Sequence, residues 1–199
     1  DTIDGDAGAD TLYGDAGNDV IDGGADADTI TGGAGSDTIT GGGSSDVAIF
    51  AGNQADYTFA SSADGLTVTV THVSTDDADT VTEVKTLRFN DGDIGVSHDG
   101  NSLVLTGADA VSDDIKVVGS HAVKVLGLDG ADTLTGGSGD DTLTGSGGND
   151  VIDGSAGADT IDGDAGSDIL YGDAGNDVIY GGADADTITG GAGDDTITG

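Results

Sequence analysis

The sequence of 199 residues contains no cysteine, proline, methionine or tryptophan, and it has 4 Lys or Arg residues against 39 Asp or Glu residues. Without cysteine there is no disulfide framework, zinc finger or thiol catalysis. A formal net charge of -35 excludes nucleic-acid binding through phosphate neutralisation. No run approaches the roughly 18 apolar residues of a membrane span, so we expect no membrane insertion. The start lacks an initiator Met and a leader-like pattern, so we expect a piece of a longer polypeptide.

What is present is a strict nine-residue repeat in two blocks, which start at Gly5 and Gly127. Every unit has Gly first and Asp sixth, and all but the unit with Ala48 have a large aliphatic residue eighth. Acidic chains with few aromatic residues are usually disordered. The strict repeat indicates that this chain folds nevertheless. The sixth positions are Asp1, Asp10, Asp19, Asp28, Asp37, Asp46, Asp132, Asp141, Asp150, Asp159, Asp168, Asp177, Asp186 and Asp195.

Each unit predicts a turn followed by a short strand. The first six residues are rich in glycine and form the turn, and the last three form a strand with one inward side chain. One unit buries a single aliphatic residue and is unstable alone, so the units must stack. The predicted buried columns are Leu12, Ile21, Ile30 and Ile39, and Leu134, Leu143, Ile152, Ile161, Leu170, Ile179, Ile188 and Ile197.

The turns are expected to bring carboxylates into register. If two units make one coil, sixth-position residues of alternate units, such as Asp10 and Asp28, face each other. Neighbouring strands lie about 4.7–4.9 Å apart, a spacing at which unscreened carboxylates repel strongly. A hard divalent cation removes this repulsion. Ca²⁺ accepts six to eight oxygen ligands in flexible geometry, whereas Mg²⁺ demands a tighter octahedron, so calcium is predicted.

These units resemble the nonapeptide G-G-x-G-x-D-x-U-x of the RTX (haemolysin-type calcium-binding) family, over about 41 residues at the start and the last 73. The resemblance implies an all-β fold of right-handed parallel β-roll (RTX solenoid) blocks, with several Ca²⁺ ions between stacked turns. It also implies a ligand set. Each ion takes positions two, four and six of one turn and positions one, three and six of the turn two units later.

Carried over onto this sequence, the sixth-position Asp supplies its carboxylate and the other positions supply carbonyl oxygens. Asp26 and Asp184 replace glycine at position four, and we expect those turns to remain intact because Asp tolerates left-handed backbone. Ser44 and Ala48 weaken the expectation of a site in the unit at Gly41. The candidate metal residues are Asp6, Gly8, Asp10, Asp15, Gly17, Asp19, Gly23, Gly24, Ala25, Asp26, Asp28, Gly32, Ala34, Asp37, Gly41, Gly43, Asp46, Leu128, Gly130, Asp132, Gly137, Gly139, Asp141, Gly145, Ser146, Gly147, Gly148, Asp150, Gly154, Ser155, Ala156, Gly157, Asp159, Gly163, Asp164, Ala165, Gly166, Asp168, Gly172, Asp173, Ala174, Gly175, Asp177, Gly181, Ala183, Asp186, Gly190, Ala192 and Asp195.

Residues 50–126 do not follow the nine-residue repeat, and they separate the predicted roll blocks 1–49 and 127–199. Strands are expected at 57–59, 66–71 and 84–89, and irregular solenoid coils at 102–105, 114–118 and 122–126. The first part resembles the β-rich segment that follows RTX blocks, and it is expected to cap one roll. The residues that carry this resemblance are Phe50, Gly52, Asp56, Tyr57, Glu83, Leu87, Phe89, Asp91 and Gly92.

A longer repeat has a period of 158 residues. Residues 1–41 and 159–199 differ at only four positions, which favours a tandem array over a single internal duplication. The differences are Ala9/Ser167, Thr11/Ile169, Asp22/Tyr180 and Ser36/Asp194.

No catalytic constellation is recognisable, and we expect no enzyme. His72, His98 and His121 stand in unrelated contexts and are interpreted as surface residues. Paired carboxylates recur identically along the repeats, whereas an active site is one asymmetric group.

The sequence therefore predicts a calcium-binding structural module of a secreted, repetitive bacterial surface protein, such as a surface layer, filament or adhesin stalk. Its expected partners are calcium and neighbouring copies of the same repeat. The basic side chains of Lys85, Arg88, Lys116 and Lys124 either meet acidic turns of such a copy or are ordinary exposed charges. The alternative function is the calcium-dependent secretion and folding module of a secreted enzyme or toxin.

Overall fold

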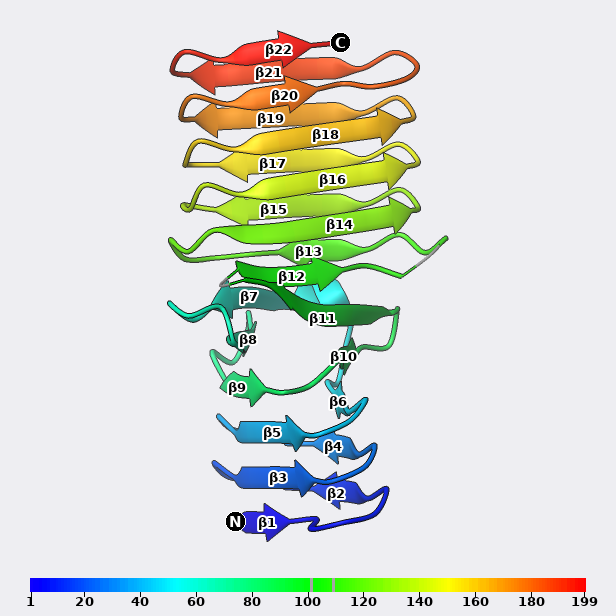
Figure 1. Cartoon of the computed structure of the whole chain (residues 1–199), viewed down its shortest axis with the longest axis vertical. Coiled ribbons are helices and arrows are strands. Elements are labelled where there is room, and N and C mark those ends of the chain that lie inside the picture. The colour runs from blue at the N-terminus through cyan, green and yellow to red at the C-terminus, as the bar shows by residue number, and fades with distance from the viewer. Residues whose placement is uncertain (101, 109) are drawn as a thin grey trace.

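The computed structural model describes residues 1–100, 102–108 and 110–199. The chain forms a tall stack of short strands, with the N-terminus at one end and the C-terminus at the other (Figure 1). Within the repeat blocks, parallel strand partners come from alternate nonapeptides, as in the pairs Ile3–Ile21 and Ile161–Ile179. Two nonapeptides therefore make one coil, as predicted.

The strands form three sheets, and one of them runs the whole length of the stack. This long sheet contains β2 (Thr11–Tyr13), β4 (Thr29–Thr31), β6 (Val47–Ile49), β10 (Thr86–Arg88), β11 (Asp93–Asp99), β12 (Ser102–Thr106), β14 (Val123–Asp129), β16 (Thr142–Gly147), β18 (Thr160–Ala165), β20 (Val178–Tyr180) and β22 (Thr196–Thr198).

Each end of the stack has its own second sheet. The N-terminal one contains β1 (Thr2–Asp4), β3 (Val20–Gly24), β5 (Thr38–Gly42), β9 (Ala78–Thr82), β8 (Thr67–His72) and β7 (Tyr57–Ser61). The C-terminal one contains β13 (Asp114–Lys116), β15 (Thr133–Gly137), β17 (Val151–Ser155), β19 (Ile169–Ala174) and β21 (Thr187–Ala192).

The core is the predicted column of eighth-position side chains, extended by residues of the intervening segment. Ile30, Leu143 and Ile161 are fully buried in the middle of the blocks. At the two ends the column is less buried. Leu12 is half-buried, and Ile197 is 48% exposed because β22 is the outermost strand of its sheet in the described part of the chain. Burial thus depends on having a coil on both sides.

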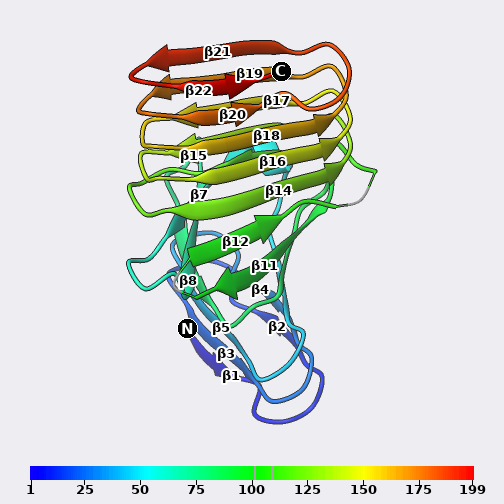
Figure 2. The same cartoon turned by 45° about the horizontal axis from the view of Figure 1, so that its top comes forward.

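The intervening segment pairs with both blocks. β9 adds to β5 in parallel and β10 adds to β6 in parallel, and the antiparallel strands β11 and β12 then carry the long sheet to β14. In Figure 2, β11 and β12 lie between β14 and the N-terminal strands. The intervening segment therefore links the strands of the two blocks in one sheet, through β10, β11 and β12.

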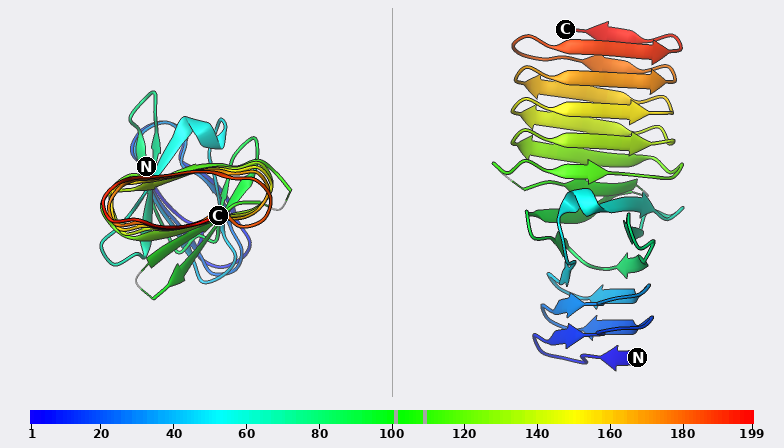
Figure 3. Two further views of the ribbon diagram at one scale, coloured as in Figure 1. Left: turned by 90° about the horizontal axis from the view of Figure 1, so that it is seen from above. Right: turned by 180° about the vertical axis from the view of Figure 1, so that it is seen from behind.

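Seen from above, the C-terminal coils superimpose as one flattened ring, and hairpins of the intervening segment project beyond it (Figure 3). The only helix of the described residues is the 3-10 turn η1 (Gln54–Asp56). Among those same residues, none forms a helix that is long and apolar enough to cross a membrane. The all-β parallel roll predicted from the repeats is confirmed.

Candidate calcium sites

The six-residue turns place non-glycine residues in left-handed backbone, as the candidate sites require. Asp6 and Asp164, at position two, have φ values of 62° and 66°. Asp26 and Asp184, at position four, have φ values of 77° and 81°. The prediction that Asp keeps these turns intact is confirmed, because Asp occupies this region more readily than most side chains.

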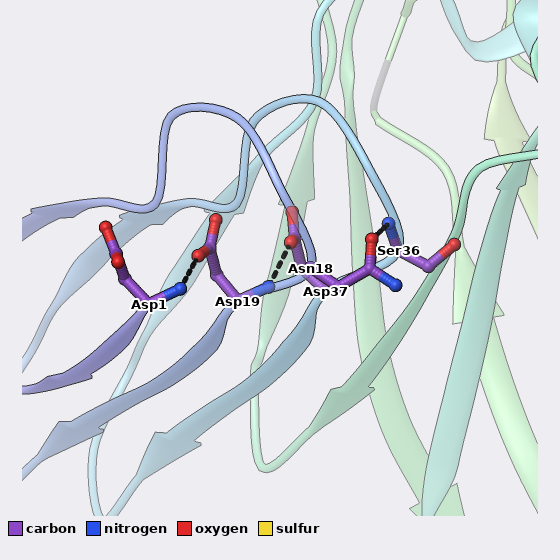
Figure 4. A network of polar contacts seen from close by, with 5 residues as sticks. All are labelled: Asp1, Asn18, Asp19, Ser36 and Asp37. Atoms are coloured by element: carbon purple, nitrogen blue, oxygen red, sulfur yellow. Dashed lines mark hydrogen bonds and ion pairs between the residues drawn. The ribbon is translucent and has the colours of Figure 1, made fainter.

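The sixth-position carboxylates form a ladder along each edge of the roll. The backbone N–H of Asp10 donates to Oδ1 of Asp28 at 2.8 Å, and the N–H of Asp150 donates to Oδ1 of Asp168 at 2.9 Å. Figure 4 shows the ladder from Asp1 through Asp19 to Asp37. Where a turn stacks on a preceding coil, one oxygen of its carboxylate is therefore fixed by that coil.

The second oxygen of these carboxylates is buried and has no hydrogen-bond partner. An unsatisfied buried carboxylate oxygen is costly, because it has lost its water and gained nothing in return. A cation between the turns would satisfy it. The affected Oδ2 atoms belong to Asp10, Asp19, Asp28, Asp37, Asp46, Asp132, Asp141, Asp150, Asp159, Asp168 and Asp177.

Backbone carbonyls of the predicted ligand positions point across the same gap between turns. A methyl group added at Gly24 would overlap the position-two carbonyl of Asp6, and one added at Gly166 would overlap the position-four carbonyl of Gly148. In the opposite direction, the position-three carbonyl of Ala25 accepts the N–H of Gly8 at 3.2 Å. Since a carbonyl has two lone pairs, such an oxygen can also face an ion.

The glycine at position one leaves room beside the carboxylate. A Cβ at Gly23 would lie 2.6 Å from Oδ2 of Asp28 and 2.6 Å from the carbonyl oxygen of Gly41, in the next turn. Two oxygens of different turns thus converge where only hydrogen fits. The structure brings the predicted positions of stacked turns together.

Burial also shifts the acidity of the carboxylates. Desolvation raises the pKa of Asp132 and Asp141 to about 6. It raises the pKa of Asp159 to about 7, with a further contribution from the charges of Asp141 and Asp177. A carboxylate that keeps its proton near neutral pH has no neighbouring positive charge. A bound cation would supply that charge and lower the pKa.

The predicted sets are incomplete where a block meets the intervening segment. Above Asp46, the carbonyl of Glu83 approaches Gly41 and the N–H of Lys85 donates to the carbonyl of Asp46. Among the described residues, no carboxylate accepts the N–H of Asp46 as Asp46 accepts that of Asp28. Below Asp141, the ladder N–H comes from Val123. At each of these two steps a site would have only one carboxylate.

Two ladder residues, Asp79 and Asp113, were missed by the sequence analysis. Asp79 accepts the N–H of Asp37 at 2.8 Å, and the N–H of Asp113 donates to Asp132 at 2.8 Å. Both lie outside the nonapeptides, but each begins a tetrapeptide of the repeat type: Asp-Thr-Val-Thr at 79–82 and Asp-Asp-Ile-Lys at 113–116. This tetrapeptide could have indicated from the sequence that Asp79 and Asp113 join the ladder.

A second ladder, at position five, was also missed. Oδ1 of Asn18 accepts the N–H of Ser36 at 3.2 Å (Figure 4), and Oδ1 of Asn149 accepts the N–H of Ser167 at 2.9 Å. The recurring pair Asn-Asp at positions five and six, as at 18–19, 149–150 and 176–177, could have indicated it, because a neutral amide oxygen beside the sixth-position carboxylates adds an acceptor without charge.

The remaining titratable side chains form no separate centre. His72 packs edge-on against Tyr57, with ring centroids 4.9 Å apart, and Arg88 pairs with Asp93 at 2.8 Å. Within residues 1–100, 102–108 and 110–199, no three His, Asp or Glu side chains converge as a metal site. The repeat sites need only two carboxylates each, with carbonyls for the rest.

Comparison with known proteins agrees with this geometry. The family model of the RTX calcium-binding nonapeptide repeat matches in four copies, at residues 1–30, 22–58, 126–161 and 162–197, which is more than half of the chain. A search of curated proteins finds no match.

Among solved structures, the crystal structure of the extracellular lipase LipA from Serratia marcescens is similar, with 22% sequence identity and a TM-score of 0.40. That match covers 90% of this chain, and this chain spans 30% of the lipase chain.

Proposed function

Because the chain belongs to the family of RTX calcium-binding nonapeptide-repeat proteins, we propose that it is a calcium-dependent structural module of a secreted, repetitive bacterial surface protein. In a surface layer, filament or adhesin stalk it would fold and stiffen on meeting extracellular calcium. Extracellular modules bind calcium with dissociation constants of about 10⁻⁴–10⁻³ M, which suits roughly millimolar calcium outside a cell.

The observation that carries this proposal is the file of buried carboxylates, each with one fixed oxygen and one oxygen without a partner. When an ion binds there, it takes oxygens from two turns and lowers the repulsion along the file. Ligands from turns of successive coils come together only in the folded roll, so binding free energy becomes folding free energy. Without calcium the chain, with its net charge of -35, would repel itself and expand.

The ligands we assign follow the stacking of turns. Between the units at Gly5 and Gly23, the ion would take the carboxylates of Asp10 and Asp28 and carbonyls of both turns. Each further pair of stacked repeat turns offers the same set. A structural role of this kind uses the whole file and needs no catalytic residue.

The 158-residue repetition supports a place in an array. Residues 159–199 nearly repeat residues 1–41. β1 and β2 at one end, and β21 and β22 at the other, are the outermost strands of their sheets. Unpaired edges of this kind accept further strands. We therefore expect neighbouring copies of the repeat to continue the stack, on the extracellular surface.

Far-UV circular dichroism of the chain during a calcium titration tests the proposal, with magnesium as the control. A cooperative gain of β signal in calcium, absent in magnesium, is expected. A chain that is equally folded in chelator would show that the files need no calcium, and the proposed function would be wrong.

A further inference from the structure

The two nearly identical segments of the chain occupy different sheets. Residues 159–199 repeat residues 1–41 with an offset of 158 residues, so each strand of the N-terminal copy has a counterpart in the C-terminal copy. β2 belongs to the long sheet, whereas its counterpart β19 belongs to the C-terminal second sheet. β3 belongs to the N-terminal second sheet, whereas its counterpart β20 belongs to the long sheet. The pairs β1 and β18, β4 and β21, and β5 and β22 change sheets in the same way.

A change of sheet is also a change of face. Each coil of the repeats contributes one strand to the long sheet and one to a second sheet, on the two flat sides of the ring in Figure 3. The two second sheets follow one another on the same side. β7, the last strand of the N-terminal one, meets β13 of the C-terminal one through the bridge between Phe59 and Val117, and the N–H of Val118 donates to the carbonyl of Phe59 at 2.8 Å. Equal sequences therefore lie on opposite faces of the roll.

The four positions that differ between the copies do not alter how a coil stacks. At one of them, Oγ of Ser36 accepts the N–H of Ala78 at 2.9 Å, and Asp194 supplies a carboxylate acceptor at the equivalent place. The other three pairs are exposed in both copies and lie outside the buried column: Ala9/Ser167, Thr11/Ile169 and Asp22/Tyr180. The C-terminal copy can therefore accept the same neighbouring strands as the N-terminal copy.

The N-terminal copy shows which strands these are. β6 pairs with β4, and β9 pairs with β5, where Ile39 lies opposite Val81. The N–H of Asp37 donates to Oδ1 of Asp79 at 2.8 Å in the same step. Beneath this cover Ile39 is 1% exposed, whereas its counterpart Ile197 in β22 is 48% exposed. The outer edges of β21 and β22 therefore match the surface that β6 and β9 cover at the other end of the chain.

We propose that in a tandem array β21 and β22 bind β6 and β9 of the following copy, and that each copy is turned by half a turn about the roll axis relative to the copy before it. The partner of the C-terminal end is thus a second copy of this chain in one fixed orientation. The inference rests on the proposed function, which supplies the array.

The half-turn makes the two faces exchange roles from copy to copy. β22 ends the long sheet, and β9 leads to β7, where a second sheet ends, so the long sheet of one copy stops in the next. β21 belongs to the C-terminal second sheet, and β6 leads into a long sheet, so this second sheet becomes the long sheet of the next copy. Each intervening segment is then crossed by a continuous sheet on one face only, and this face alternates. The hairpins that project beyond the ring (Figure 3) point to opposite sides in successive copies.

The test is a two-copy chain, made of residues 1–199 followed once more by residues 42–199, and imaged in calcium by negative-stain electron microscopy. Because the sequence has no cysteine, Ala63→Cys in each copy gives unique attachment points for biotin and monovalent streptavidin. Ala63 is exposed in the turn between β7 and β8. The two labels should lie on opposite sides of the rod. Labels on the same side would overturn the inference.

Deletions in the first copy provide matched controls. Removing residues 145–153, which are one nonapeptide, shifts everything that follows by half a coil and should bring the labels to the same side. Removing residues 145–162, which are one complete coil, should leave them on opposite sides. If the one-unit deletion leaves the labels on opposite sides, the phase of the repeat does not set the orientation, and the inference is wrong.

Circular dichroism of the same two-copy chain keeps this inference apart from the proposed function. A chain that folds only in calcium but carries both labels on one side would refute the half-turn and leave the proposed function standing. A chain that is equally folded in chelator would refute the proposed function, and the labels would still report the orientation of the copies.

Discussion

The two ends of the chain carry almost the same sequence in different surroundings. The units 23–31 and 181–189 are identical, but Asp28 is 1% exposed, whereas Asp186 is only partly buried. The next units show the same contrast, since Ile39 is 1% exposed and its counterpart Ile197 is 48% exposed. The N-terminal copy is covered by the intervening segment, whereas β21 and β22 of the C-terminal copy are the outermost strands of their sheets among the described residues.

The other face of each copy shows the reverse pattern. Asp10 and Leu12 are only partly buried, but their counterparts Asp168 and Leu170 are completely buried, because the C-terminal copy rests on coils that precede it. A nonapeptide therefore supplies half of a site. The stacking of a second turn, from the next coil, completes it, as expected of a solenoid in which each repeat contacts only its neighbours.

The largest expected change in the calcium midpoint of folding comes from removing one carboxylate. The two equivalent carboxylates to compare are those of Asp28 and Asp186. Asp28→Asn disturbs the steps to Asp10 and Asp46, whereas Asp186→Asn disturbs only the step to Asp168. Asp28→Asn should raise the calcium midpoint of folding about tenfold, equivalent to about 1.4 kcal/mol, and Asp186→Asn should raise it less. Calcium titrations followed by circular dichroism measure both. Equal shifts would contradict the role of stacking.

The next effect concerns glycine at position one. A Cβ at Gly23 would lie 2.6 Å from Oδ2 of Asp28 and 2.6 Å from the carbonyl of Gly41, whereas a Cβ at Gly43 would have nothing within 4 Å. Gly23→Ala should therefore raise the calcium midpoint several-fold, since two converging oxygens must separate. Gly43→Ala is the control and should leave the midpoint nearly unchanged. A similar shift in both variants would show that loss of glycine, and not crowding of the oxygens, is responsible.

Protons should replace calcium in part, mainly in the C-terminal block. Burial raises the pKa of Asp159 from 3.8 to about 7, so the folded state holds a proton that the unfolded chain has released. That contribution to stability is complete below about pH 4 and is lost as the pH rises to about 7. In chelator, β signal should therefore increase on acidification from pH 8 to pH 5. Half-saturation of the folded sites should need more calcium at pH 6 than at pH 8, because protons compete with calcium for the same carboxylate oxygens.

Hydrogen exchange at pH 5 in chelator shows which strands are stabilised by protonation of their carboxylates. The carboxylates with a pKa raised to about 6 or 7 in the C-terminal block are Asp132, Asp141 and Asp159, so amide protection should appear in β16–β18 before β2–β4. Protection that appears first in β2–β4, or uniformly, would contradict this assignment.

The smallest effect is expected at the start of the C-terminal block, where Leu128 has a φ of 73°. Left-handed backbone costs a branched side chain about 1–2 kcal/mol, and Asn tolerates it better. Leu128→Asn should raise the thermal midpoint in calcium by about 2–4 °C. Ser146→Asn, at a φ of 80° in the next unit of the same file, is the control and should change it little. An unchanged or lower midpoint for Leu128→Asn would show that its backbone is not strained.

The repeat made much of the fold predictable. The period fixed which side chains point inward, so the column through Ile21, Ile39 and Leu143 could be named in advance. It also fixed that carboxylates of alternate units face each other, and β3 pairs with β5 in the register that this requires. In these blocks the contacts follow directly from counting along the sequence.

The intervening segment could not be predicted in this way. Asp79 reaches the file only because β8 and β9 return as a hairpin, at a separation that no period specifies. The continuity of the long sheet through β10 and β11 likewise depends on pairing between distant strands. The short signals at Asp79 and Asp113 are four residues long and gain meaning only beside a neighbouring turn.

The most direct test of the account is a crystal grown in calcium, with the ions located by anomalous scattering. The account predicts ions between stacked turns of successive coils, each beside a pair such as Asp150 and Asp168, with Oδ2 now a ligand. Files that stay free of ions in saturating calcium, with the roll still folded, would contradict the claim that calcium holds these turns together.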